Sequence, residues 1–100
     1  MVVLGWGSTF GPIREAVKQA REKGKKVSHI HLRYLNPLPR DLASSLRKFK
    51  TVMIAEMNMG QLLKMVRADY LIDAVGFNKI QGRPFKVSEI VTRINRILEG

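Results

Sequence analysis

Short apolar segments alternate along this chain with longer segments whose apolar residues recur every three or four positions. Apolar runs predict buried strands, whereas a repeat of three or four residues predicts amphipathic helices. The predicted strands are residues 2–4, 27–32, 51–55 and 72–75, with a short fifth strand at 79–81. Such alternation is typical of βαβ units, whose strands run parallel. We therefore expect an α/β fold, a three-layer sandwich in which a mostly parallel sheet of four to five strands carries helices on both faces.

Helices are expected between and after these strands. Pro12 suits the first position of a helix and Gly24 is a stop signal, so the first helix lies between them. The strands are almost continuously apolar, as expected where both faces of a sheet are covered. The inward faces of the four predicted helices are Ile13, Ala16, Val17 and Ala20; Leu42, Leu46 and Phe49; Leu62, Leu63, Val66 and Tyr70; and Val87, Ile90, Val91, Ile94 and Ile97.

The length of the chain bounds its domain organisation. A chain of 100 residues is the size of one ordinary domain, so we expect residues 1–100 to form a single domain, cut from a longer polypeptide. No apolar run is long enough to span a bilayer and no signal-peptide pattern opens the chain, so the expected compartment is the cytoplasm. The sequence contains no cysteine, which excludes disulfides, a thiolate nucleophile and a cysteine-held zinc or iron–sulfur site.

Basic residues outnumber acidic residues by 18 to 8, which gives a formal net charge of +10. Such an excess favours nucleic acid, acidic protein partners or anionic small molecules as ligands. Eleven of the basic residues lie between residues 12 and 50, so the excess gathers in one half of the fold. Arg14, Lys18, Arg21 and Lys25 form one stripe on the first predicted helix. A solvated helix face is the simplest explanation of this stripe, and docking against an acidic partner surface is the alternative.

Ligands of a parallel α/β sheet bind beyond the carboxyl ends of its strands. The first strand ends there in a glycine-rich turn, residues 5–11, whose Gly7, Ser8 and Thr9 are candidates for binding an anion. The glycine spacing is one residue longer than in the dinucleotide fingerprint, and no lysine follows the last glycine as in a P-loop. We favour a tight turn in which Ser8 or Thr9 caps the helix and glycine allows close packing of helix and strand.

Three further polar residues lie in or at the end of predicted strands. His29 and His31 point to the same side of the second strand, and packing or hydrogen bonding is their expected role because no third metal ligand lies nearby. Glu56 ends the third strand as a candidate acid or base, although capping a loop or pairing with Arg33 is the favoured interpretation. The sequence holds no nucleophile–base pair or metal-ligand set, so we expect no catalytic residue and no metal site.

Four segments at loop positions carry a family resemblance. In order they are residues 5–12 (GWGSTFGP), 31–39 (HLRYLNPLP), 56–61 (EMNMGQ) and 81–85 (QGRPF). Together they resemble the C-terminal domain of the alpha subunit of 2-oxoacid:ferredoxin oxidoreductases, most closely the 2-oxoglutarate type. The wider relation is to the transketolase C-terminal domain, and the resemblance covers essentially the whole chain.

The resemblance implies a transketolase C-terminal-like fold within an enzyme complex that oxidatively decarboxylates a 2-oxoacid to acyl-coenzyme A and passes electrons to ferredoxin. Thiamine diphosphate, magnesium, iron–sulfur clusters and coenzyme A are expected to be bound by the complex and not by this chain alone, which lacks the diphosphate-binding Gly-Asp-Gly motif and every cluster cysteine. The implied role is structural, with beta, gamma or delta subunits as partners. The candidate interface residues are Arg33, Asn36, Glu56, Asn58 and Gln61.

Two other functions remain open at the level of sequence. The first is a free-standing basic α/β domain that binds nucleic acid, although aromatic residues make up only 7% of the chain and show no stacking set, which disfavours specific binding of single strands. The second is a phosphate- or nucleotide-binding domain that uses the glycine-rich turn.

Overall fold

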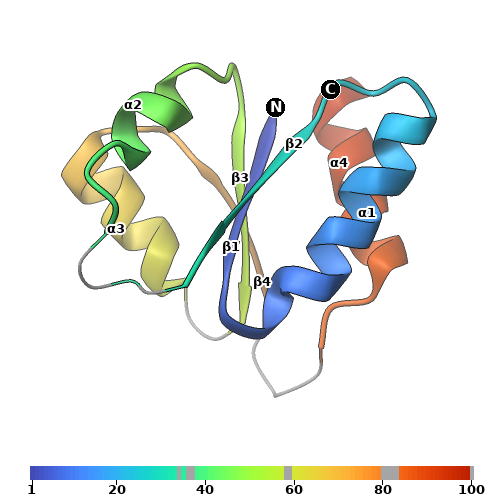
Figure 1. The fold of residues 1–100 in the computed structure, drawn as a ribbon, viewed down its shortest axis with the longest axis horizontal. Coiled ribbons are helices and arrows are strands. Elements are labelled where there is room, and N and C mark those ends of the chain that lie inside the picture. Colours follow the sequence, from blue (N-terminus) through green and yellow to red (C-terminus); the bar gives the residue numbers. More distant parts are fainter. Residues whose placement is uncertain (34, 36–37, 58–59, 80–83, 100) are drawn as a thin grey trace.

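A computed structural model of the chain describes residues 1–33, 35, 38–57, 60–79 and 84–99. Strands and helices alternate through it, as the ribbon in Figure 1 shows. The elements in chain order are β1 (Val2–Trp6), the 3-10 turn η1 (Gly7–Thr9), α1 (Phe10–Glu22), β2 (Ser28–Leu32), α2 (Leu42–Arg47), β3 (Val52–Met57), α3 (Gln61–Tyr70), β4 (Val75–Lys79) and α4 (Val87–Glu99).

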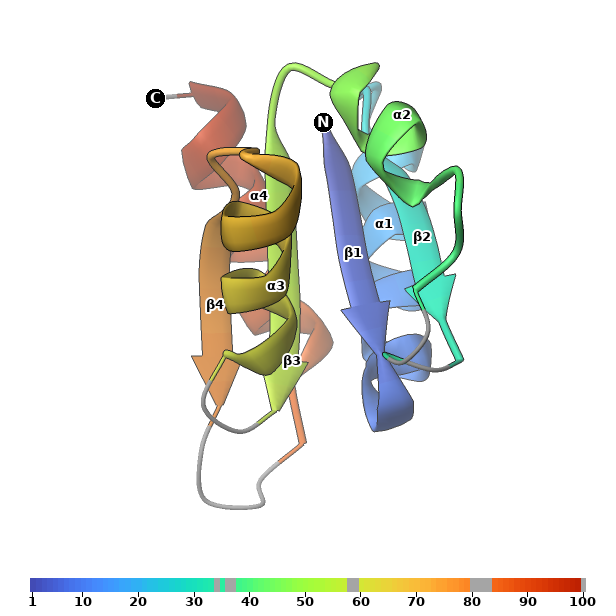
Figure 2. The same ribbon diagram turned by 90° about the vertical axis from the view of Figure 1, so that its left-hand side faces the viewer.

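The four strands form one parallel sheet in the order β2-β1-β3-β4 (Figure 2). Val2 of β1 lies opposite Ser28 of β2 on one side and Val52 of β3 on the other, and Met53 of β3 lies opposite Val75 of β4. Within the described residues, β2 and β4 are therefore the two edges of the sheet. Because all strands run in the same direction, their carboxyl ends meet at one rim of the molecule.

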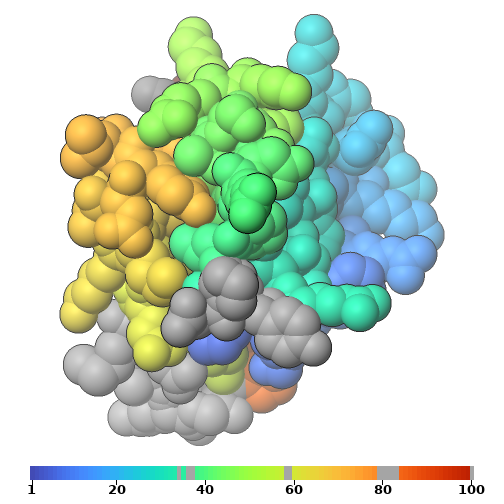
Figure 3. All heavy atoms as spheres, turned by 60° about the vertical axis from the view of Figure 1, so that its left-hand side comes forward, coloured from blue at the N-terminus to red at the C-terminus, as the bar shows by residue number. Residues whose placement is uncertain are grey.

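Helices cover both faces of this sheet: α1 and α4 lie on one side, and α2 and α3 on the other (Figure 1). Successive residues of a strand point to opposite faces. Val3 and Met53 accordingly belong to the core beneath α1 and α4, and Leu4 and Ile54 to the core beneath α2 and α3. Figure 3 shows the outer surface on the side of α2 and α3. The predicted three-layer α/β sandwich is confirmed, with four strands in its sheet.

The inward faces of the helices follow the predicted apolar pattern. Ile13, Ala16, Val17 and Ala20 are buried in α1, and the other three helices bury Leu42 and Leu46, Leu62 and Val66, and Ile90 and Ile94. Helix α1 begins at Phe10, two residues before Pro12, and ends before Gly24, whose φ of 83° is left-handed. In the described part of the chain, no helix has the length and apolar character needed to cross a membrane.

The predicted position of the fourth strand is wrong. The apolar run 72–75 indicates a strand, but β4 occupies Val75–Lys79 and begins where the predicted strand ends. The predicted fifth strand at 79–81 contributes its first residue to the end of β4, and its other two residues lie outside the described part of the chain.

Backbone hydrogen bonding explains why the run after α3 is not a strand. Leu71 ends the helix in the left-handed conformation, with φ of 56°. The amide of Ala74 then donates to the carbonyl of Ile72 at 2.9 Å. The carbonyl of Ala74 accepts from Nε and Nη2 of Arg67 at 3.0 and 2.7 Å. A tight turn and an arginine therefore occupy backbone groups that pairing with β3 would need.

Candidate functional site

Glu56 lies at the carboxyl rim of the sheet, near the end of β3, and its side chain is 0% exposed. Oε1 accepts hydrogen bonds from the indole Nε1 of Trp6 at 2.9 Å and from the amide of Leu62 at 3.0 Å. Oε2 accepts from the amide of Leu63 at 3.0 Å. Three donors thus satisfy a carboxylate that would be costly to bury without partners.

Glu56 caps α3 from a neighbouring strand. The first amides of a helix lack acceptors within the helix, and the helix dipole favours negative charge at that end. Gly60 precedes α3 with a φ of 80°, a conformation that residues with a Cβ rarely adopt. A Cβ at this position would also lie 2.8 Å from Nδ2 of Asn78. Glycine at position 60 therefore allows the chain to turn and present the amides of Leu62 and Leu63 to Glu56.

The sequence predicts that Glu56 caps a loop or pairs with Arg33; it does act as a cap, but of the first turn of α3 and not of a loop, and the pairing with Arg33 is wrong. Arg33 is exposed, whereas both oxygens of Glu56 are bonded inside the molecule. Because three donors hold this buried carboxylate, we infer that its role is to position α3 and the end of β1. Sequence reasoning missed Trp6 as its partner, although an indole donor at the end of the predicted first strand is the available signal.

The glycine-rich turn serves close packing. A Cβ on Gly5 would overlap Cδ1 of Ile13 and lie 2.8 Å from Oγ1 of Thr9, so only glycine fits between β1 and α1. Thr9 is buried and its hydroxyl donates to the carbonyl of Trp6 at 2.9 Å. Neither η1 nor α1 has a side-chain cap, so the helix cap predicted at Ser8 or Thr9 is wrong, while the packing role of glycine is confirmed.

The anion site predicted at this turn remains a prediction. Gly7 and Ser8 are exposed, and together with Trp6 and Met57 they line a hollow of about 100 Å³. Pockets that hold drug-sized ligands measure about 300–1,000 Å³, so this hollow could hold a small anion but could not enclose a nucleotide.

Of the candidate interface residues, Arg33, Glu56 and Gln61 lie on this rim within the described part of the chain. Arg33 and Gln61 are exposed, so both are free to contact another molecule. Glu56 is buried, so any part that it plays at an interface runs through the loop and helix it holds. Asn36 and Asn58 lie outside the described residues. The interface role of all five residues remains a prediction.

His29 and His31 lie on the α1 side of the edge strand β2. Phe10 packs against both, with ring centroids 5.7 Å from His29 and 5.0 Å from His31, so the predicted packing is confirmed. Their Nε2 and Nδ1 atoms, respectively, are buried without a hydrogen-bond partner. Burial, followed by the charge of His31, lowers the pKa of His29, and burial followed by the charge of Arg33 lowers the pKa of His31. Within the described residues, no three His, Cys, Asp or Glu side chains gather as a metal site.

Comparison with known protein families identifies the family to which this chain belongs. Residues 1–90 match the family described as pyruvate:ferredoxin oxidoreductase core domain II. The chain belongs to this family. The resemblance carried by the loop segments is thereby confirmed.

The relatives of this core domain II chain include oxidoreductase subunits named KorA and subunits named alpha. It is 44% identical over its whole length to the 2-oxoglutarate oxidoreductase subunit KorA of Mycobacterium tuberculosis, of which it covers 15%. It is 31% identical to the alpha subunit of 2-oxoacid:ferredoxin oxidoreductase 2 of Aeropyrum pernix, with 99% of this chain and 16% of that subunit aligned.

A solved structure has the same fold. The 2-oxoglutarate:ferredoxin oxidoreductase of Magnetococcus marinus, with 2-oxoglutarate, coenzyme A and succinyl-CoA bound, aligns with a TM-score of 0.84 and 31% identity. The alignment covers 95% of this chain and 17% of that chain. The core domain II chain thus spans about one sixth of the length of the relatives it matches.

Proposed function

We propose that this chain acts as a non-catalytic assembly domain in the alpha subunit of a 2-oxoacid:ferredoxin oxidoreductase, with 2-oxoglutarate as the substrate of the complex. Such a complex oxidatively decarboxylates the 2-oxoacid, forms the acyl-coenzyme A and transfers electrons to ferredoxin. The observation that carries the proposal is the 44% identity to a 2-oxoglutarate oxidoreductase subunit over all 100 residues. Its implied partners are the other subunits of the complex, and its proposed compartment is the cytoplasm.

The chemistry of the rim supports a structural role for this domain. Thiamine diphosphate carries a diphosphate and a bound magnesium ion, but the rim hollow measures about 100 Å³ and its buried carboxylate is already engaged by three donors. Those rim residues that the structure describes therefore do not fit that cofactor. Without cysteine, the chain also has no thiolate ligands for the iron–sulfur clusters that pass electrons to ferredoxin.

The bonds of Glu56 support a structural contribution of this domain to the complex. One carboxylate joins the end of β1, through Trp6, to the first turn of α3. Exposed Arg33 and Gln61 lie on the same rim. We infer that the part of this rim held by Glu56 is a preformed seat for neighbouring parts of the complex, because the end of β1 and the start of α3 are already joined before a partner arrives and little ordering entropy is lost there on association.

The proposal is tested by a domain exchange in the Mycobacterium tuberculosis KorA subunit. The KorA segment that aligns with this chain is replaced by residues 1–100, and the hybrid is expressed with its partner subunits. We expect the hybrid complex to assemble and to oxidise 2-oxoglutarate in a reaction that requires coenzyme A. The isolated chain should show no turnover.

Two variants of the hybrid separate assembly from chemistry. Glu56→Ala should reduce the fraction of assembled complex, with normal turnover per assembled complex, whereas Glu15→Gln on the exposed face of α1 should change neither. A hybrid that assembles fully but turns over no 2-oxoglutarate would contradict the substrate assignment. Turnover by the isolated chain would contradict the non-catalytic role.

A further inference from the structure

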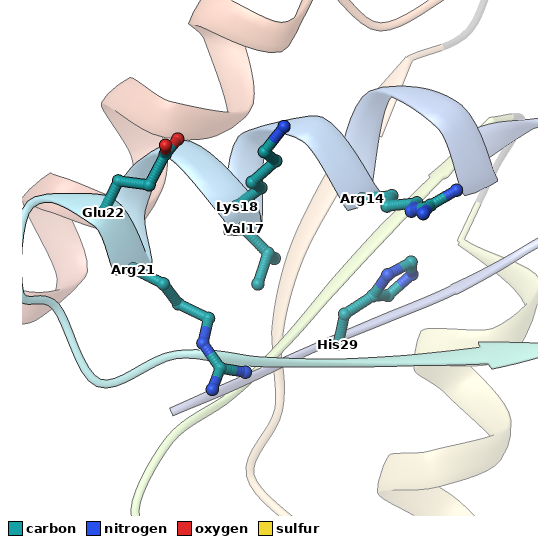
Figure 4. A pocket seen from close by; sticks show the side chains of 6 residues that line it. All are labelled: Arg14, Val17, Lys18, Arg21, Glu22 and His29. Carbon is teal, nitrogen blue, oxygen red and sulfur yellow. The ribbon is translucent and has the colours of Figure 1, made fainter.

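A cationic groove lies between α1 and the edge strand β2, on the side of the molecule away from α2 and α3. Arg14, Val17, Lys18, Arg21, Glu22 and His29 line it, and its volume is about 480 Å³. Figure 4 shows Arg21 extending from α1 toward β2 and Arg14 lying over the His29 ring of that strand, while Lys18 and Glu22 turn away from the strand. We refer to this region as the α1–β2 groove.

Arg14 of the groove lies over the Phe10 ring, with its Cζ atom 6.0 Å from the ring centroid, but the groove cations have no acidic partner in the described part of the chain. In the described residues, neither Arg14 nor Arg21 forms an ion pair, and the nearby pair of Lys25 Nζ and Glu99 Oε1, 3.9 Å apart, lies outside the groove. Like charges spaced three or four residues apart on one helix face repel each other. An external anion that reached Arg14 and Arg21 would relieve this repulsion.

Phe10, His29 and His31 form an aromatic wall beside the groove. Within the described residues, one ring nitrogen of each histidine is buried without a hydrogen-bond partner. Phe10 is 44% exposed and its ring packs on His29 and His31. A partner that covers this wall would bury the exposed apolar surface of Phe10.

The outer edge of β2 offers backbone donors. The amide of Ser28 donates inward, to the carbonyl of Met1 at 2.9 Å. Amides alternate in direction along a strand, so those of His29 and His31 point outward, away from β1. In the described residues no strand pairs with this edge. An unpaired edge of this kind can accept an added strand from another chain.

We propose that the α1–β2 groove binds an extended acidic segment of another polypeptide, which adds to the outer edge of β2 and places its carboxylates on Arg14 and Arg21. The inference rests on contacts of this chain alone and does not depend on the oxidoreductase assignment.

The spacing of the groove fits a strand. Arg14 and Arg21 are seven residues apart on α1, which is about 10.5 Å of helix. Side chains on one side of a strand repeat about every 6.7 Å, so acidic residues two or four positions apart come within reach of the two flexible arginine stems.

A free phosphate suits this groove less well than a peptide. Phosphate sites use amides at helix N-termini, whereas the groove runs along the middle and end of α1, where the amides are bonded within the helix. Arg14 and Arg21 are also about 10.5 Å apart along the helix, a spacing that suits two carboxylates on one strand better than a single compact phosphate.

The probe is a fluorescent peptide of about ten residues in which Glu and Thr alternate, titrated into the 100-residue chain and its variants. Arg14→Gln with Arg21→Gln removes the two proposed partners. Lys48→Gln with Lys64→Gln removes the same net charge from other exposed surfaces. We expect the first pair to weaken binding about fivefold to tenfold, as loss of two surface ion pairs does. The control pair should change binding less than about twofold.

Amide exchange measured by nuclear magnetic resonance distinguishes strand addition from attraction between charges alone. On binding, the amides of His29 and His31 should exchange more slowly with solvent, while the amide of Ser28, already bonded, should change little. The pKa of His29 should rise, because a bound carboxylate would counter the burial and the charge of His31 that lower it.

Each remaining outcome would overturn the proposal. Equal loss of binding in the two double variants would show nonspecific attraction to a basic protein. Unchanged exchange at His29 and His31 would exclude strand addition. Displacement of the peptide by an equal concentration of inorganic phosphate or coenzyme A would make the groove a small-anion site, and stronger binding of RNA would make it a nucleic-acid surface.

Discussion

The indole Nε1 of Trp6 donates a hydrogen bond of 2.9 Å to Oε1 of Glu56, across 50 positions of sequence. The bond links the ends of β1 and β3, neighbouring strands of the sheet. Because the same carboxylate also caps α3 through Leu62 and Leu63, this pair ties two strands and a helix together at the rim.

Replacement of Glu56 should destabilise the fold strongly. In Glu56→Ala, the amides of Leu62 and Leu63 and the Trp6 indole lose their acceptor inside the protein, and we expect a loss of about 3–5 kcal/mol in the free energy of unfolding. Glu56→Gln, which sets an amide group against these donors, should cost about 1–3 kcal/mol. Urea denaturation measures both. Glu15→Gln on the exposed face of α1 is the control and should stay within about 0.5 kcal/mol.

Trp6→Phe isolates the hydrogen bond between the strands. The variant keeps most of the aromatic ring and removes the Nε1 donor, so we expect a cost of about 0.5–1.5 kcal/mol. Combined with Glu56→Gln in a double-mutant cycle, the two changes should be non-additive by at least about 0.5 kcal/mol. Strict additivity would mean that the two side chains do not interact in solution.

Alanine at Gly5 and at Gly11 should have opposite effects. A Cβ on Gly5 would overlap Ile13 and crowd Thr9, so Gly5→Ala should cost about 1–3 kcal/mol by overpacking. A Cβ on Gly11 meets no atom within 4 Å, and alanine is the better helix former by up to about 1 kcal/mol. Gly11→Ala should therefore raise the melting temperature. A similar destabilisation in both variants would contradict the close packing of β1 against α1.

Stability should fall as the pH is lowered toward 5. Burial holds the pKa of His29 and of His31 below the ordinary value of 6.5, so the unfolded chain takes up protons before the folded one does. The stability from these neutral rings is complete above about pH 6.5 and declines as the pH falls through that value and then through their folded pKa values. Urea midpoints at pH 7.5 and 5.5 measure the decline.

The His29→Gln, His31→Gln double variant is the control for this effect. Its urea midpoint should depend less on pH over the same range, because glutamine does not titrate. An unchanged slope would assign the pH dependence to other groups.

Arg67 should matter more than its exposed position on α3 indicates. Its Nε and Nη2 both donate to the carbonyl of Ala74, where the chain turns into β4. Arg67→Met keeps the apolar stem and removes both donors, so we expect a loss of about 1–2 kcal/mol. Lys64→Met, one turn earlier, should stay within about 0.5 kcal/mol. Equal effects would indicate that the guanidinium bonds add nothing to stability.

Much of the fold could be predicted from local pattern alone. Apolar residues spaced as Ile13, Ala16, Val17 and Ala20 can form only one buried helix face, and the buried residues of α1 are these four. The start of β4 could not be predicted in the same way. The apolar run from residue 72 fits a strand, and only the bonds from Arg67 and the left-handed Leu71 exclude it.

The sequence by itself determined the order of strands and helices, the parallel sheet and the family, because periodicity and loop motifs are properties of residues close together in the chain. The tertiary structure alone decided which of its charged groups are engaged. The carboxylate of Glu56 is hydrogen-bonded to Trp6 and to the start of α3. Arg14 and Arg21 line a groove beside β2, an edge strand within the described residues. These pairings join segments far apart in sequence, and their distances depend on how helices pack on the sheet, which no local pattern encodes.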